Sequence, residues 1–297
     1  MNFNHLNNLL GSKCFSLAIC MPEDTECIEA AYEATMQGFV KCIFVGNTDI
    51  MTDLINKNSL KNFAPEMIDA RTPEEAAFKT VELIRNKKAS AIMKGVISTP
   101  ILLKAILNSQ TGIKDSNVLS HTLIYEADNS LKFITDGGMI PQPDLKALIE
   151  IIKNSAKVAK KFGFKKIKVG VISTSDTVDP QITSSLNAAI LAQMSAKGQF
   201  GDDIIVDGPF TLDSIISEDA ANIKGVKKSF DGTADVIVGP DIDTVNIFAK
   251  SLIYYGNVQC GGLIVGAKCP VVLLSRADTK EIKLNSIKLA LAAGVED

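Results

Sequence analysis

The sequence predicts an α/β protein built from two α/β domains with mostly parallel sheets. Short apolar runs of strand length alternate along the 297 residues with longer stretches of helical periodicity. Such alternation is typical of βαβ units, whose right-handed crossovers place helices on both faces of a parallel sheet. The Pro- and Gly-rich segment GGMIPQPD at residues 137–144 is the best internal boundary.

Each predicted strand is a short apolar run. The strands are Phe15–Cys20, Cys42–Val45, Ala91–Lys94, Val118–Tyr125, Phe133–Thr135, Ile167–Ile172, Ile204–Val206, Val236–Val238, Gly262–Val265 and Val271–Leu274. The predicted helices between them are Glu26–Gln37, Pro73–Asn86, Pro100–Asn108, Leu145–Phe162, Thr183–Lys197, Val245–Tyr255 and Thr279–Ala292.

Several helix starts carry capping residues. Thr72, Pro73 and Glu75 form a capping box, and Ser98-Thr99-Pro100 opens the next helix in the same way. Asp278 and Glu281 fit the N-cap and N3 positions of the last helix.

We predict a first domain of residues 1–140 plus 277–297 and a second of residues 141–276. A long helix follows the boundary segment and starts the second domain. The last helix returns to the first domain because chain ends often lie close together.

The composition excludes several classes of function. Hydrophobic residues make up 46% and charged residues 22% of the chain, which is ordinary for a globular protein. The net charge of −3 does not indicate binding to nucleic acid, which a basic surface would favour. Six scattered cysteines without a C-x-x-C pair, and only two histidines, argue against zinc and for buried, reduced thiols. The apolar stretch at residues 14–22 is too short for a membrane span, and only Lys13 supplies positive charge before it, which argues against a signal peptide. We therefore predict a cytoplasmic protein without a membrane partner.

Candidate site residues follow the predicted strands, because open α/β sheets bind ligands outside the carboxyl ends of their strands. Glycines, hydroxyls and cations predominate there, which suits an anionic ligand. Most have a structural alternative: glycines form turns, Ser98 and Thr99 cap a helix, and His121 forms core hydrogen bonds. Arg276 is hardest to explain structurally, because a guanidinium directly after four apolar residues needs an anionic partner.

Common catalytic motifs are absent. No G-x-G-x-x-G follows a strand, and neither G-x-x-x-x-G-K-[ST] nor G-x-S-x-G occurs. An enzyme with this sequence would therefore act by positioning and charge stabilisation, without a covalent serine.

Five blocks of sequence resemble the phosphate acetyl/butyryl transferase family, and its butyryl branch most. In family order they are Met93–Asn108, Leu119–Glu126, Ile134–Leu145, Val206–Asp213 and Gly266–Asp278. The resemblance implies reversible conversion of a short or branched acyl-CoA, with butyryl-CoA favoured, and phosphate into acyl phosphate and CoA. It also implies two α/β domains around an inter-domain cleft, a homodimer, and neither metal nor cofactor, because CoA and phosphate are substrates.

The resemblance also assigns roles to residues. Ser275 would hydrogen-bond the thioester carbonyl or departing thiolate, Arg276 would bind phosphate and stabilise the tetrahedral centre, and Lys104 stands where relatives have a second arginine. The implied binding residues are Lys94, Gly95, Ser98, Thr99, His121, Asp136, Asp207, Gly208, Pro209, Asn246, Gly266, Lys268 and Glu281.

The chain departs from the family at several of these positions. Lysine at 104 lacks the planar fork of arginine, which predicts a lower affinity for phosphate. Gly137-Gly138 replaces two small residues with a side chain, which predicts a wider cleft, and Val245 replaces a glycine. The acid used as base in the acetyl branch aligns with Ile282, beside Glu281, so no base is assigned.

Rival functions remain open at this stage: a phosphate acetyltransferase, an acyl-carrier-protein acyltransferase, a dehydrogenase on a similar scaffold, or a non-catalytic acyl-CoA or anion sensor. The sequence disfavours the dehydrogenase, because no acidic cluster for a metal stands out. Acyl chain length, branching and the physiological direction are not readable from the sequence.

Overall fold

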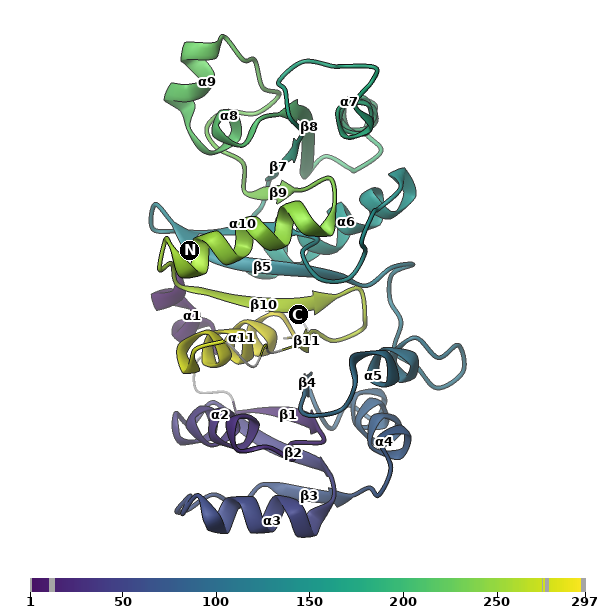
Figure 1. The fold of residues 1–297 in the computed structure, drawn as a ribbon, viewed down its shortest axis with the longest axis vertical. Coiled ribbons are helices and arrows are strands. Elements are labelled where there is room, and N and C mark those ends of the chain that lie inside the picture. The colour runs from purple at the N-terminus through teal and green to yellow at the C-terminus, as the bar shows by residue number, and fades with distance from the viewer. Residues whose placement is uncertain (1, 11–13, 274, 276–277, 295–297) are drawn as a thin grey trace. The chain divides into compact units, whose positions relative to one another are not determined.

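A computed structural model describes residues 2–10, 14–273, 275 and 278–294. The chain forms two compact units (Figure 1). Residues 3–117 and 260–297 form one, called here the terminal unit, and residues 118–259 with Asn2 form the other, called the central unit. Among the helices of the described residues, none has the length and apolar character needed to cross a membrane.

The terminal unit contains six strands: β1 (Phe15–Cys20), β2 (Val40–Gly46), β3 (Glu66–Asp69), β4 (Ala91–Lys94), β10 (Cys260–Val265) and β11 (Val271–Val272). Their order is β3-β2-β1-β4-β11-β10. All neighbours run parallel except β10, which pairs antiparallel with β11 through Ile264 and Val271. The strands carry the core, with side chains fully shielded from solvent at Leu17, Ile19, Phe44, Ile92 and Met93.

Helices cover both faces of this sheet, as the crossover rule requires. The helices are α1 (Phe3–Leu10), α2 (Thr25–Met36), α3 (Thr48–Lys57), α4 (Pro73–Arg85), α5 (Thr99–Ile106) and α11 (Lys280–Ala293). Helices α1, α11, α2 and α3 pack on one another in a row along one face, whereas α4 and α5 pack together on the other (Figure 1).

The central unit contains five strands, which pair in the order β5-β6-β9-β7-β8. Its strands are β5 (Ser120–Ala127), β6 (Ser130–Thr135), β7 (Ile167–Ile172), β8 (Ile204–Phe210) and β9 (Val236–Val238). Only the β5–β6 hairpin is antiparallel. The helices are α6 (Leu145–Lys161), α7 (Thr183–Ala196), α8 (Leu212–Ile216), α9 (Glu218–Lys224) and α10 (Ile242–Tyr254), with α6 packing on four of the five strands. The prediction of an α/β fold with mostly parallel strands is confirmed.

The boundaries between the two units differ from those that the sequence predicts. The structure divides after residues 117 and 259, whereas the sequence predicts boundaries after 140 and 276. Strand pairing explains the difference. The β5–β6 hairpin precedes the Pro-rich segment, yet β6 pairs with β9 of the central unit, through Thr135 and Val238. Strand β11 follows residue 260 and pairs with β4, through Val272 and Met93.

Strand β3 and helix α3, which the sequence analysis did not predict, bury few side chains. Strand β3 has no fully buried residue, and α3 buries only Met51. The short helices α1, α8 and α9 were missed as well. Strand β11 ends at Val272, two residues before its predicted end at Leu274, which lies outside the described residues.

Candidate active site

The carboxyl edge of the terminal unit's sheet brings together two of the predicted segments. Lys94 is the last residue of β4 and Ser275 follows β11, and these two strands are parallel neighbours. On its other side β4 pairs with β1. The strand order reverses between β1 and β4, and such a switch point leaves a crevice where ligands of open α/β sheets bind.

The Lys94 ammonium shapes the turn that follows β4. Its Nζ donates to the carbonyl oxygens of Gly95 and Ile97, both at 2.9 Å. Gly95 lies so close to the end of β1 that a Cβ there would meet the carbonyl oxygen of Met21 at 2.0 Å. A glycine is therefore required at position 95, and Lys94 acts first on the turn itself while keeping positive charge at the crevice.

Helix α5 begins beside this turn with a hydroxyl that does not cap it. The Ser98 side chain makes no capping hydrogen bond and is exposed, whereas Thr72 caps α4 as predicted by accepting from the Glu75 N–H at 3.2 Å. Half-buried Thr99 is the first residue of α5. The capping role expected for the Ser98 hydroxyl is therefore wrong, and this hydroxyl faces solvent at the carboxyl edge.

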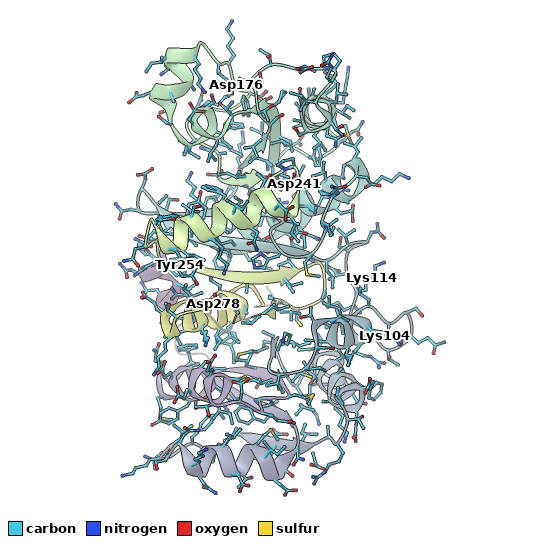
Figure 2. The ribbon with its side chains drawn as sticks, in the orientation of Figure 1. Lys104, Lys114, Asp176, Asp241, Tyr254 and Asp278 are labelled. Atoms are coloured by element: carbon cyan, nitrogen blue, oxygen red, sulfur yellow. The ribbon has the colours of Figure 1, made fainter. Side chains whose placement is uncertain are left out.

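Lys104 lies in the last turn of α5, exposed to solvent (Figure 2). It lines a pocket of about 330 Å³ between α4 and α5, together with Phe78 and Pro100. The structure thus places Lys104 about one and a half helical turns from the start of α5, rather than in the Lys94 turn.

The segment after β11 is held by reciprocal hydrogen bonds. The Ser275 N–H donates to Asp278 Oδ2 at 2.7 Å, and the Asp278 N–H donates to the Ser275 carbonyl at 3.1 Å. Asp278 is therefore not the cap of α11; Thr279 caps it by accepting from the Ile282 N–H. Arg276 lies outside the described residues.

The first turn of α11 shows two further side chains. Glu281 is exposed there. Lys283 is only 7% exposed and pairs at 3.1 Å with Glu26, from the first turn of α2. Sequence reasoning missed this buried cation, which lies within one turn of the start of α11.

Gly266 and Lys268 do not belong to this edge. They follow the predicted strand Gly262–Val265 and would lie at this edge only if that strand were parallel to its neighbours. Because β10 runs antiparallel to β11, its carboxyl end lies where β11 begins. Gly266 accepts hydrogen bonds from the N–H groups of Asp115 and Ser116, and Lys268 lies at the sheet edge opposite Lys94 and Ser275.

In the central unit, Asp136 organises the loop after β6. The carboxylate is 3% exposed and accepts four backbone N–H bonds, from His121, Gly138, Met139 and Ile140, at 2.9–3.1 Å. This saturation makes Asp136 a positioning group for the loop. The antiparallel β5 begins at the same edge, so His121 lies against Gly138, where a Cβ would come within 3.2 Å of the His121 Cβ.

Asn246 joins the same loop from α10, where its Nδ2 donates to the Gly137 carbonyl at 3.1 Å. Its neighbour Val245 fills the space that Gly137 leaves, since a Cβ at 137 would meet Val245 Cγ1 at 2.9 Å. The prediction that Gly137-Gly138 widens the cleft is therefore not supported at Gly137, because the valine that replaces the family's glycine occupies that volume.

Asp207, Gly208 and Pro209 lie inside β8, which extends to Phe210. Asp207 accepts from the N–H groups of Gly208 and Ser229. The residue that follows β8 is Thr211, whose N–H and hydroxyl both donate to Asp176.

The pKa of Asp176 is lowered, because the hydrogen bonds from Thr211 and Ser214 and the nearby Lys224 outweigh the opposing effect of partial burial. The sequence analysis did not select Asp176, and it did not select residues 21–24, which follow β1. Applying the carboxyl-end rule to every strand would have found the residues after β1.

Each unit thus supplies polar groups at the carboxyl edge of its sheet. The terminal unit offers Ser98, Ser275 and the Lys94 turn, and the central unit offers His121, Asn246 and the glycine loop held by Asp136. In the terminal unit, the hydroxyls and the fixed cation suit an anionic, hydrogen-bonding ligand. In the central unit, the amide and the imidazole can hydrogen-bond a polar ligand.

Comparison with known proteins identifies the family of the chain. Residues 49–291 match the family model described as phosphate acetyl/butaryl transferase. The chain is 37% identical over 281 residues to the phosphate butyryltransferase of Clostridium acetobutylicum, covering 94% of this chain and 93% of that protein. It is 33% identical to the phosphate acetyltransferase of Thermotoga maritima, covering 92% and 93%.

A solved structure is also similar. The branched-chain phosphotransacylase from Enterococcus faecalis V583 superposes with a TM-score of 0.82 at 28% identity, covering 94% of this chain and 99% of that one. The chain therefore belongs to the phosphate acetyl/butyryl transferase family and is an acyltransferase.

Proposed function

We propose that the chain transfers a butyryl group, or another short or branched acyl group, reversibly between CoA and inorganic phosphate. A phosphate oxygen attacks the thioester carbonyl carbon, the tetrahedral oxyanion collapses, and the C–S bond breaks to release CoA thiolate and acyl phosphate. The proposal is carried by the placement of Ser275, which follows β11 at the same sheet edge at which Lys94 ends the neighbouring parallel strand β4.

The proposed roles follow from that placement and from the sequence. The Ser275 hydroxyl hydrogen-bonds the carbonyl oxygen or the departing sulfur, and Arg276, which follows it, binds phosphate and stabilises the developing negative charge. A fixed guanidinium suits this role because it contacts phosphate through two N–H groups. Phosphate is already anionic, so the reaction proceeds without a strong base.

The test is release of free thiol from butyryl-CoA driven by phosphate or arsenate. Arg276→Ala is expected to lower turnover about 100-fold or more, the usual effect of removing a charge stabiliser, and Arg276→Lys to restore part of it. Wild-type turnover in Arg276→Ala would show that the proposed role of Arg276 is wrong.

Acyl preference decides between the butyryl proposal and phosphate acetyltransferase, which the 33% identity to the Thermotoga maritima protein keeps open. Acetyl-, propionyl-, butyryl- and isovaleryl-CoA are compared by kcat/KM. Each methylene is worth about 1–3 kcal/mol in an apolar pocket, so the series should separate the candidates at least tenfold. CoA binding without turnover on any member of the panel would favour a non-catalytic relative.

We also propose a cytoplasmic homodimer that needs neither metal nor cofactor. Exposed apolar side chains on α10 support the dimer: Ile247 is 67% and Tyr254 61% exposed, and their spacing of seven residues puts them on one helix face. Light scattering of the wild type and of Ile247→Asp tests the dimer. Turnover measured after exhaustive chelation tests the independence from metal.

A further inference from the structure

We infer that the ion pair between buried Lys283 and Glu26 positions Ser275 for acyl transfer. The inference rests on the proposed function, in which the Ser275 hydroxyl contacts the substrate. Lys283 lies at the start of α11 and Glu26 at the start of α2, and Lys283 Nζ is 3.1 Å from Glu26 Oε2. Lys283 acts through Ser275 in this proposal and not on the substrate, so it is a positioning residue.

The ion pair connects the segments that follow two strands of the terminal unit. Helix α2 follows β1 and helix α11 follows β11, and β4 lies between these two strands and pairs in parallel with both. The two helices pack on each other along one face of the sheet (Figure 1). Because β4 ends at Lys94, the ion pair joins the chain segments on either side of the Lys94 turn.

On the α11 side, a short series of hydrogen bonds leads from Lys283 to Ser275. The Lys283 N–H donates to the Thr279 carbonyl at 3.0 Å, and Thr279 caps the helix. Asp278, directly before this cap, exchanges hydrogen bonds with Ser275 at 2.7 and 3.1 Å. A displacement of the first turn of α11 is therefore passed on to Ser275.

On the α2 side, a similar series leads from Glu26 to the Lys94 turn. Asp24 caps α2 with its carboxylate. The carbonyl of Met21, which lies between β1 and that cap, accepts from the Val96 N–H at 2.8 Å. The ion pair thus completes a path between the two segments on which the proposed function depends.

The burial of Lys283 indicates a role in geometry more than in stability. Its side chain is 9% exposed, whereas that of Glu26 is 58% exposed. A buried ammonium needs a charged partner, yet replacing a buried ion pair by apolar side chains of similar volume is often neutral for stability. What the pair adds is a fixed direction for both side chains. Lys280, one turn earlier on α11, pairs with Glu33 at 3.3 Å but is 72% exposed, and exposed pairs contribute little.

Turnover of butyryl-CoA with phosphate tests the inference in Lys283→Met, which keeps a long side chain and removes the charge. We expect kcat to fall about ten- to 100-fold, since a displacement of about 1 Å can cost about 100-fold. The urea midpoint should stay close to that of the wild type, because the carboxylate left behind is solvated. Lys280→Met is the matched control, because it removes the same charge from the same contact between α2 and α11, and its kcat should be unchanged. An unchanged kcat in Lys283→Met, or an equal loss in Lys280→Met, overturns the inference.

A double-mutant cycle tests whether the two charges act together. Glu26→Gln should reproduce the loss of kcat, and Glu26→Gln combined with Lys283→Met should lose no more than Lys283→Met alone, because either change breaks the same ion pair. Losses that multiply in the double variant would show that the two side chains act independently, and the inference fails.

Hydrogen exchange separates positioning from a general loosening of α11, and it needs no turnover. In Lys283→Met the amides of Ser275 and Asp278 should exchange about tenfold faster, while the Gly262 amide, which donates to Ser286 of α11 at 3.0 Å, keeps its rate. Equal acceleration at Gly262, or none at Ser275 and Asp278, overturns the inference. If the wild type turns over no acyl-CoA, the proposed function fails, and these exchange rates still decide whether Lys283 holds the Ser275 segment.

Discussion

Replacing Gly137 by alanine should destabilise the central unit, because Val245 already occupies the space of a Cβ. The added carbon would meet Val245 Cγ1 at 2.9 Å, and carbon atoms in contact prefer about 3.5–4.0 Å. One of the two groups must therefore move by about 0.6–1 Å. Overpacking on this scale costs about 1–3 kcal/mol. Gly137 does not have a positive φ, so the penalty comes from packing and not from the backbone conformation.

A double-mutant cycle isolates this contact. Val245 is 1% exposed, so Val245→Ala alone loses burial and costs about 1–3 kcal/mol. Combined with Gly137→Ala it removes the clashing methyl, and we expect a favourable coupling of about 1–2 kcal/mol. Unfolding of the four chains in urea is followed by circular dichroism, because the sequence contains no tryptophan.

The control substitution is Gly138→Ala, whose Cβ would meet His121 at 3.2 Å and not Val245. Val245→Ala should therefore not rescue it. If the free energies of Gly137→Ala and Val245→Ala add within about 0.5 kcal/mol, the two departures from the family are not coupled through this contact, and the account of the filled volume fails.

Three further predictions concern titratable groups. Asp235→Asn should lower the free energy of unfolding in urea by about 3 kcal/mol, because it removes the charged partner 3.7 Å from Lys132, whose side chain is 14% exposed. A decrease below about 1 kcal/mol contradicts this prediction. Because the pKa of Asp176 is lowered in the folded state, its ionised form stabilises the fold above the unfolded pKa of about 4, and this stability is lost as the pH falls through the lower folded pKa. Thr211→Ala removes hydrogen bonds to Asp176, so it should lower the free energy of unfolding at pH 7 and make that free energy fall less steeply with acid. A single native thiol, that of exposed Cys14, should react with Ellman's reagent at pH 8, since burial raises the pKa of Cys20 to about 12; an unchanged yield in Cys14→Ser would show that another thiol is accessible.

The apolar pattern of a strand does not reveal its direction in the sheet. An apolar run such as Gly262–Val265 identifies a buried strand, but its residues are the same whether the strand runs up or down. The five-residue connection from β10 to β11 (residues 266–270) is too short for a parallel crossover, which needs about a dozen residues or more. The short connection therefore predicts that β10 and β11 are antiparallel, which places Gly266 and Lys268 at the edge of the sheet opposite Lys94.

Other site residues could be predicted from position alone. Lys94 ends β4 and Gly95 follows it as expected, because a three-residue apolar run followed by lysine and glycine leaves little freedom in where the strand ends. The hydrogen bonds of those residues could not be predicted. Whether Lys94 faces a ligand or its own turn depends on the carbonyls of Gly95 and Ile97, whose directions no residue pattern encodes.

Asp136 shows how a saturated carboxylate can still contribute to a site. With four backbone N–H donors it has little capacity left for a substrate, and its negative charge would repel one. Asp136 provides order: the same oxygen that accepts from the Gly138 N–H also accepts from the His121 N–H, so the glycine loop and the His121 backbone are held together before any ligand arrives. Binding then does not have to order the loop, and preorganised polar groups are those that stabilise a transition state most.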